Sequence, residues 1–126
     1  MHYSYVNGER RPVEILVFRM DPSVVEEFIT VDHTVWTLGE AFMPGLERIP
    51  FLSKEVWLDD AHPGEVTIVF VWDTQADWDA VGAVDFQQTL QRRFDELFPH
   101  RVELIRAPHE DSHFGIHRVS RFERVD

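Results

Sequence analysis

The eight residues 65–72 constrain the fold of this chain more than any other segment does. Successive side chains of a β-strand point to opposite faces. Here both faces are almost wholly apolar, with Val66, Ile68, Phe70 and Trp72 on one and Thr67, Val69 and Val71 on the other. A strand that is apolar on both faces has to be covered on both faces. The fold must therefore place one layer of structure on each side of this strand.

Runs of β-branched and aromatic residues predict three more strands. They span residues 13–20, 51–58 and 102–105. The segment from Pro108 to the end begins polar and then alternates weakly, with Ile116 and Phe122 apolar on one face. Because such alternation is typical of a half-buried strand, this tail is expected to add an edge strand.

Two helices are expected between the third and fourth strands. Thr74 begins a capping box that predicts a short helix through Val81. Asp85 is expected to cap a longer, amphipathic helix that Pro99 stops. With a further helix after the first strand, the order of elements is β-α-β-β-α-β.

This order predicts an α+β, ferredoxin-like split sandwich with a four-stranded antiparallel sheet and helices on one face. A single domain is expected over residues 1–126, with a core at about 13–106 and a C-terminal extension at 107–126. One helix layer leaves the second face of the third strand bare. The simplest cover is a second copy of the chain, which predicts a homodimer through the sheet face and a dimeric α/β barrel.

The net charge of −11 lies in the middle of the chain, where residues 21–79 contain thirteen acidic side chains and two basic ones. Nucleic acids and anionic membrane surfaces bind basic surfaces, so neither is an expected partner. No apolar run approaches the roughly 18 residues of a membrane span, and residues 1–12 do not resemble a signal peptide. We therefore expect a soluble, cytoplasmic protein.

The first helix contains an anomalous position. It is expected to run from about Pro22 to about Leu38, with Asp21 as its cap and Gly39 at its end. Projected at about 100° per residue, its apolar stripe consists of Val25, Phe28, Ile29 and Trp36. Asp32 falls in the middle of that stripe. Because a core-facing carboxylate is costly unless it is paired, Asp32 marks either a buried structural bond or a ligand site.

Both interpretations of Asp32 stay open on the sequence alone. Four side chains are candidate structural partners: Trp57, Trp72, Arg19 and Lys54. As a functional group, a desolvated carboxylate has a raised pKa and can act as a base near neutral pH. His33, at the margin of the stripe, is either a boundary residue or a second candidate base.

Four tryptophans and ten phenylalanines offer the material for an aromatic cavity. The strands that carry Trp57 and Trp72 would be neighbours in a β-hairpin. A small, flat hydrophobic ligand would fit between such rings, oriented by Asp32 or His33. The candidate lining residues are Trp36, Trp57, Phe70, Trp72 and Trp78. The alternative is that these rings only pack in the core and in a dimer interface.

The sequence favours neither a metal nor a cofactor. It has no cysteine and none of the nucleophile, phosphate-loop or zinc motifs. His109, His113 and His117 recur every four residues and would form a metal-binding face on a helix. Gly115 disfavours a helix there, so a solvated tail is the preferred interpretation.

The chain resembles the dimeric α+β barrel superfamily, in particular the antibiotic-biosynthesis-monooxygenase-like domains. The resemblance covers about residues 13–105. Its most recognisable part is the segment 67–74, TIVFVWDT, followed by Trp78 and Phe86. The helix segment 32–36 together with KEVWL at 54–58 resembles a small, functionally uncharacterised subfamily.

The resemblance implies a monooxygenase-like enzyme that oxidises an aromatic or quinone-like compound without a cofactor, with Asp32 or His33 as base. The alternative is a non-catalytic dimeric module that binds a small molecule or serves in assembly. Relatives that degrade heme have a histidine in the helix after the third strand and an asparagine on the first strand. The helix expected from Asp85 has no histidine and the strand expected at 13–20 has no asparagine, although Trp72 matches their tryptophan, so heme is not expected.

Overall fold

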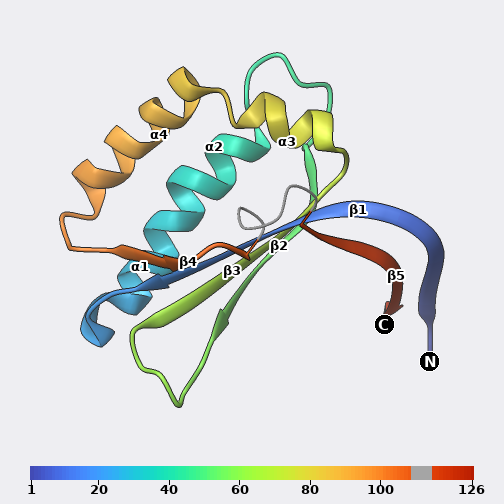
Figure 1. The fold of residues 1–126 in the computed structure, drawn as a ribbon, viewed down its shortest axis with the longest axis horizontal. Coiled ribbons are helices and arrows are strands. Elements are labelled where there is room, and N and C mark those ends of the chain that lie inside the picture. Colours follow the sequence, from blue (N-terminus) through green and yellow to red (C-terminus); the bar gives the residue numbers. More distant parts are fainter. Residues whose placement is uncertain (109–114) are drawn as a thin grey trace.

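The computed structural model describes residues 1–108 and 115–126, and Figure 1 shows that its helices lie on one face of a curved sheet. The strands are β1 (Tyr3–Arg19), β2 (Phe51–Leu58), β3 (Glu65–Trp72), β4 (Glu103–Arg106) and β5 (Ile116–Arg124). The order β2-β3-β1-β4 is antiparallel throughout, and β5 pairs with β1 as a fifth strand. The structure thus confirms the predicted α+β, ferredoxin-like fold. The C-terminal tail adds β5 to it, a strand that pairs with β1.

Strand β3 has the predicted bounds and the predicted two faces. Its face towards the helices, from Val66 to Trp72 in alternate positions, belongs to the hydrophobic core. On the other face, Val69 is paired with Ile15 of β1 and Val71 with Val13. Figure 1 shows no helix on that side of the sheet in the described part of the chain.

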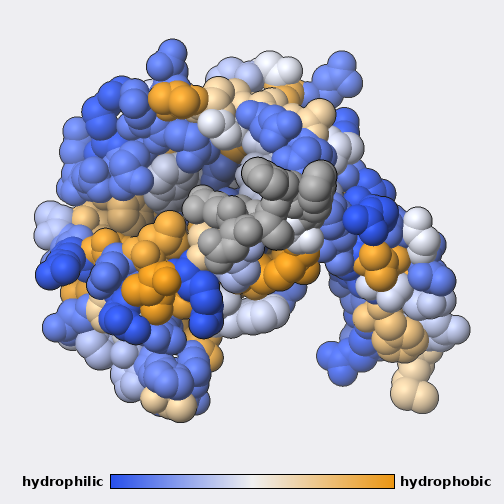
Figure 2. Space-filling view, viewed as in Figure 1, coloured by the Kyte–Doolittle hydropathy of each residue, from blue (hydrophilic) through white to orange (hydrophobic). Residues whose placement is uncertain are grey.

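Strand β1 begins at Tyr3, well before the start expected at residue 13. The sequence gives no strand signal there because these residues are mostly polar; their extended form is fixed by pairing with β5. The two strands form an arm, residues 3–12 and 116–124, whose far end, where residues 3–7 pair with residues 120–124, stands clear of the body of the molecule (Figure 2). Tyr3 stacks on Phe122 across the arm, with ring centroids 4.9 Å apart.

The first helical segment is longer and less regular than expected. It consists of a 3₁₀ turn (Pro22–Val24), α1 (Val25–Asp32), a π-helical turn (His33–Thr37) and α2 (Leu38–Ala41). The expected end at Gly39 is wrong, because this glycine serves a close contact between helices. A Cβ atom at position 39 would lie 2.7 Å from Leu90 Cδ2, so any larger residue would require the end of the Leu90 side chain to shift.

The second helical region comprises α3 (Gln75–Val81) and α4 (Val84–Leu97). Thr74 caps α3 as predicted, since its hydroxyl accepts the backbone N–H of Asp77. The predicted cap at Asp85 is wrong: the cap position is Ala83, two residues earlier, and Asp85 lies in the first turn of α4. A carboxylate there still favours the helix through its dipole.

None of the described helices is long and apolar enough to cross a membrane.

Candidate functional site

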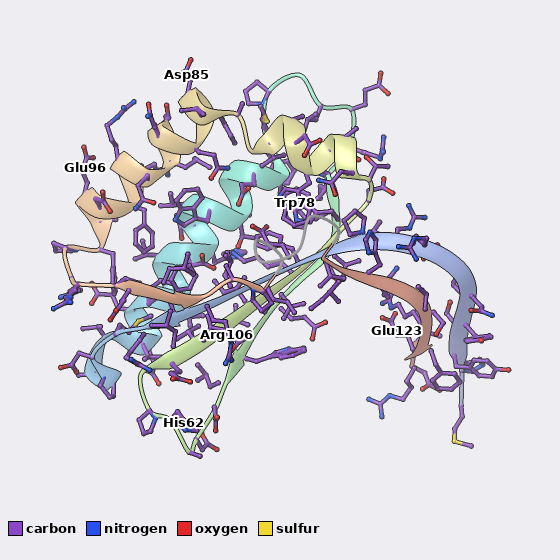
Figure 3. All side chains as sticks on the ribbon, viewed as in Figure 1. His62, Trp78, Asp85, Glu96, Arg106 and Glu123 are labelled. Carbon is purple, nitrogen blue, oxygen red and sulfur yellow. The ribbon has the colours of Figure 1, made fainter. Side chains whose placement is uncertain are left out.

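A cavity of about 690 Å³ lies between the sheet and the helices and is called the interlayer cavity below. Leu16, Ile68 and Phe70 line it from the sheet. Four of the five predicted lining residues border it: Trp36, Phe70, Trp72 and Trp78. Figure 3 shows Trp78 on the side of α3 that faces the sheet. The aromatic walls expected from the sequence therefore exist, and polar groups lie among them.

Asp32 borders the interlayer cavity and is clasped by Lys54 of β2. It is 4% exposed, and Lys54 Nζ lies 2.6 Å from its Oδ2. Both side chains are almost fully buried, so the ion pair joins the helix layer to the sheet inside the protein. Of the four candidate partners, Lys54 is therefore the one that binds Asp32. Trp72 instead donates its indole N–H to Glu14 Oε1, at 3.2 Å.

The π-helical turn explains how a single lysine bonds twice to one helix. Lys54 Nζ also donates to Thr37 Oγ1 at 2.5 Å. Asp32 and Thr37 are five residues apart, which corresponds to about 140° around a regular α-helix. The π turn over His33–Thr37 has more residues per turn and brings the two positions towards one side. An irregularity of this kind is frequent at functional sites.

Burial raises the pKa of Asp32 above the usual value for aspartate, while the charge and hydrogen bond of Lys54 act in the opposite direction. The ion pair occupies Oδ2. Across residues 1–108 and 115–126, Asp32 Oδ1 makes no hydrogen bond. Asp32 thus joins the helix layer to the sheet through one of its two carboxylate oxygens.

Glu40 is the second buried acid of the cavity, and the sequence analysis missed it. Glu40 is 7% exposed, and its one hydrogen bond within the described part of the chain is a long one, 3.4 Å, from Gln87 Nε2 to Oε2. Burial, and next the negative charge of Glu14, raise the pKa of Glu40 from 4.5 to about 8. Glu40 therefore carries a proton at neutral pH.

The helical periodicity that indicates Glu40 continues past Gly39, where the helix was expected to end. Glu40 follows Asp32 by eight residues on the same helical segment, and a helix continued to Ala41 would have placed it near the same stripe. With a helix that ends at Gly39, Glu40 would lie in a loop, and no burial is expected for it there. A glycine in a helix can equally mark a close approach of two elements, as it does here.

His33 and Trp57 lie away from the interlayer cavity, which corrects their expected placement. His33 is exposed, because its position on the helix is turned to solvent. Trp57 is paired with Thr67 of β3 and shares its face of the sheet, opposite the helices. It is 53% exposed, and its indole N–H bonds Glu55. The hairpin neighbours were predicted correctly, but the register turns Trp57 outward.

The structure adds little to the metal hypothesis. His109 and His113 lie outside the described residues, and His117 is paired with Pro12 in the arm. Three side chains in the turn between β2 and β3 have ligand atoms within 4.8 Å of one another: Asp59, His62 and Glu65. They are largely exposed. An ion pair of 2.8 Å between His62 and Asp59, and one of 3.2 Å between Glu65 and Arg19, account for their arrangement.

Several solved structures superpose on this chain. A protein from Caulobacter crescentus, provisionally assigned as an antibiotic biosynthesis monooxygenase, superposes with a TM-score of 0.50 at 10% identity, over 95% of this chain and 94% of its own. One from Chloroflexus aurantiacus with the same provisional assignment gives 0.48 at 20% identity over 76% and 92%. A conserved protein from Methanosarcina mazei gives 0.47 at 12% identity over 90% and 92%.

No family model matches the sequence, and no curated protein matches it either. The chain has the ferredoxin-like fold of the antibiotic-biosynthesis-monooxygenase-like proteins, as the sequence predicted. At this level of identity the likeness defines the fold alone. The residues that line the interlayer cavity are therefore the basis for a proposed function.

The Asp32–Lys54 pair leads to a test of stability. The substitution Asp32→Asn leaves Lys54 buried beside an uncharged amide, so we expect the free energy of unfolding to fall by about 3 kcal/mol. The double variant Asp32→Asn/Lys54→Met replaces the pair by uncharged groups and should be about 1–2 kcal/mol more stable than Asp32→Asn. Urea unfolding followed by circular dichroism measures wild type, the double variant and both single variants, Lys54→Met included. Strictly additive effects of the two substitutions would contradict a coupled buried pair.

The raised pKa of Glu40 leads to a second test. The folded state holds a proton on Glu40 that the unfolded state releases above pH 4.5, so this group's contribution to stability is present below pH 4.5 and is lost as the pH rises towards 8. The expected slope is up to about 1.4 kcal/mol per pH unit.

Glu40→Gln should remove this component, so wild type should lose stability relative to Glu40→Gln between pH 5 and 8. Glu96→Gln, on the outward face of α4 (Figure 3), is the matched control. Parallel stability curves for wild type and Glu40→Gln would show that Glu40 titrates normally.

Proposed function

We propose that this protein oxidises a small, flat aromatic compound in the interlayer cavity without a metal or organic cofactor. The observation that supports this most directly is Asp32, a buried carboxylate with one oxygen on Lys54 and the other directed at no protein donor in the described residues. The aromatic lining suits a planar ligand. The provisional assignment of structural neighbours as monooxygenases agrees with the proposal.

The ion pair suits deprotonation of a phenolic hydroxyl group. Asp32 Oδ1 is a proton acceptor whose burial strengthens it as a base. Lys54 has three N–H donors, of which two serve Asp32 and Thr37. The third makes no hydrogen bond to residues 1–108 or 115–126, and we expect it to stabilise the phenolate oxygen that forms. Base and oxyanion donor thus act on the same substrate atom, and each keeps the other in place.

The phenolate is electron-rich at a ring carbon and reacts there with dioxygen. For the phenolic tautomer of an anthrone, the ring CH₂ group of the keto form becomes a carbonyl group. One oxygen atom of O₂ enters the product, and the other leaves as water together with both hydrogens, one of them through Asp32. Atoms and electrons balance, and no external reductant is needed.

The test is oxygen uptake with a hydroxylated anthrone, together with the absorbance of the quinone product. Wild type should accelerate both over buffer. Asp32→Asn should lose at least about 100-fold in kcat, the usual contribution of a positioned base. The double variant Asp32→Asn/Lys54→Met should be as inactive and keeps the test meaningful if the single variant folds poorly.

Asp60→Asn, an identical substitution in the exposed β2–β3 turn, is the control and should leave turnover unchanged. Full turnover by either Asp32 variant would remove Asp32 as the base. Anthrone binding without oxygen uptake by wild type would favour the alternative function, a module that binds the ligand without catalysis.

We also propose that the protein works as a homodimer through the bare face of the sheet. That face presents Ile15 of β1, which is paired with Val69 of β3, and no helix in the described part of the chain covers it. An apolar strand face is stable when a second layer packs on it. A second copy supplies the same surface by two-fold symmetry.

Sedimentation at micromolar concentration tests the dimer. Wild type should sediment with twice the mass of the chain, and Val69→Lys should shift the population towards monomer because the lysine would be buried in the interface. Val84→Lys, at an exposed position on the helix side, should stay dimeric. A monomeric wild type, or an unchanged mass for Val69→Lys, would contradict the proposal.

A further inference from the structure

Glu40 is a buried carboxyl group that the proposed reaction leaves unused. It is 7% exposed and borders the interlayer cavity from α2. Its Oε2 accepts one hydrogen bond, a long one of 3.4 Å, from Gln87 Nε2. Its Oε1 makes no hydrogen bond to residues 1–108 or 115–126. One oxygen of a buried acid is therefore left without a partner in the described part of the chain.

This oxygen is open to the interlayer cavity. Among the described residues, the fully buried side-chain nitrogen and oxygen atoms that lack a hydrogen-bond partner are Arg11 Nε and Arg118 Nε. Glu40 Oε1 also lacks a partner there, so it must have some accessible surface. The space that Glu40 borders is the interlayer cavity, with a volume of about 690 Å³. A ligand in the cavity can therefore reach Oε1.

The protonation state of Glu40 makes Oε1 a donor. Burial, and next the negative charge of Glu14, raise the pKa of Glu40 to about 8. A protonated carboxyl group has one O–H donor, whereas the ionised group only accepts. The amide of Gln87 donates to Glu40 Oε2 and, at 2.9 Å, to the carbonyl oxygen of Val81. Since the carbonyl oxygen of a carboxylic acid is its stronger acceptor, the proton belongs on Oε1.

The other buried acid of the cavity has the opposite character. Lys54 Nζ lies 2.6 Å from Asp32 Oδ2, and its charge and hydrogen bond favour the ionised form of Asp32 against the effect of burial. No basic side chain of residues 1–108 or 115–126 forms an ion pair with Glu40. Two acids in such different surroundings divide into an acceptor and a donor. The cavity therefore presents an acceptor at Asp32 and a neutral donor at Glu40.

We propose that Glu40 donates a hydrogen bond to a carbonyl oxygen of the ligand, so that the interlayer cavity selects aromatic ketones and quinones. The inference rests on the proposed function for the aromatic ring and for the oxygen held at Asp32 and Lys54. It adds a contact for a second oxygen of the same ligand. In the quinone that the proposed reaction forms, the new carbonyl group lies across the ring from the first oxygen. Asp32 and Glu40 are eight residues apart on one helical segment, so they can contact opposite edges of that ring.

The contact depends on one proton. The charged groups that act on Glu40 are Glu14 of β1, Asp32 of α1 and Lys54 of β2. Asp79 of α3 also borders the cavity. Because Glu40 donates only while it is protonated, the affinity for a ketone should be highest below pH 8 and should fall as the pH rises above 8. A ligand of the same shape without the oxygen should not show this fall.

The experiment is equilibrium dialysis of the full chain against 2-acetylnaphthalene and 2-isopropenylnaphthalene. The two probes have the same shape and differ by a C=O group in place of a C=CH₂ group. Neither probe titrates, so a pH dependence of binding arises from the protein. Between pH 7 and pH 9.5, the affinity for the ketone relative to that for the alkene should fall at least about fivefold, because the carbonyl group loses its donor.

Two substitutions at position 40 assign the effect. Glu40→Gln cannot titrate but keeps a donor, since its amide oxygen can replace Oε2 beside Gln87 while its N–H replaces the O–H at the cavity. It should keep the preference that wild type has at pH 7 over the whole pH range. Glu40→Leu has no donor and should show at every pH the low preference of wild type at pH 9.5. Glu96→Gln, on the outward face of α4, is the control and should behave as wild type does.

The outcomes separate this inference from the proposed function. If both probes bind but their affinity ratio does not vary with pH, or is unchanged in Glu40→Leu, the donor role of Glu40 is overturned while the aromatic cavity stands. If the pH dependence persists in Glu40→Gln, a different group titrates and the inference is overturned. The expected ratios without oxidation of the anthrone would support the role of Glu40 and remove the proposed reaction. If neither probe binds to wild type, both proposals fail together.

Discussion

The buried ion pair between Asp32 and Lys54 is the interaction on which the cavity depends. Lys54 projects from β2 under the helices, and Asp32 and Thr37 hold it from the helical segment above. Each charge is tolerable only because the other is present, since an uncompensated charge at this depth is strongly destabilising. The pair therefore fixes the helix relative to the sheet and defines one wall of the cavity.

The same pair decides what remains for a ligand. It neutralises one carboxylate of the cavity, whose lining also includes the carboxyl groups of Glu14, Glu40 and Asp79. Burial, and next the negative charge of Glu14, raise the pKa of Glu40 to about 8. The buried side chain of Glu40 is therefore accommodated at neutral pH in its protonated form.

The parts of this picture that follow a periodic pattern could be read from the sequence. The bounds and faces of β3, the order of the elements and the anomaly of Asp32 were all predictable, because strand and helix periodicities determine which residues share a face. Lys54 could be named only as one of four partners, since the choice depends on register across two strands and a helix. Trp57 was misplaced for the same reason.

The rest depended on tertiary contacts that no local pattern contains. Gly39 predicts the end of a helix, but in the structure it lies against Leu90 of α4 and the helix continues. Because the helix was expected to end there, Glu40 was not among the predicted site residues. The π turn that aligns Asp32 with Thr37 also has no sequence signal of its own. The extended form of residues 3–12 depends on β5, more than a hundred residues away in sequence.

The most direct test of this account is a carbon-13 NMR titration of the Glu40 carboxyl group in the folded protein. Glu40→Gln identifies the resonance, and Glu96→Gln provides a reference for an exposed glutamate. The account predicts a midpoint near pH 8. A midpoint near 4.5 in the free protein would contradict it, because Glu40 would then be an ordinary ionised carboxylate and the cavity would hold no exchangeable proton.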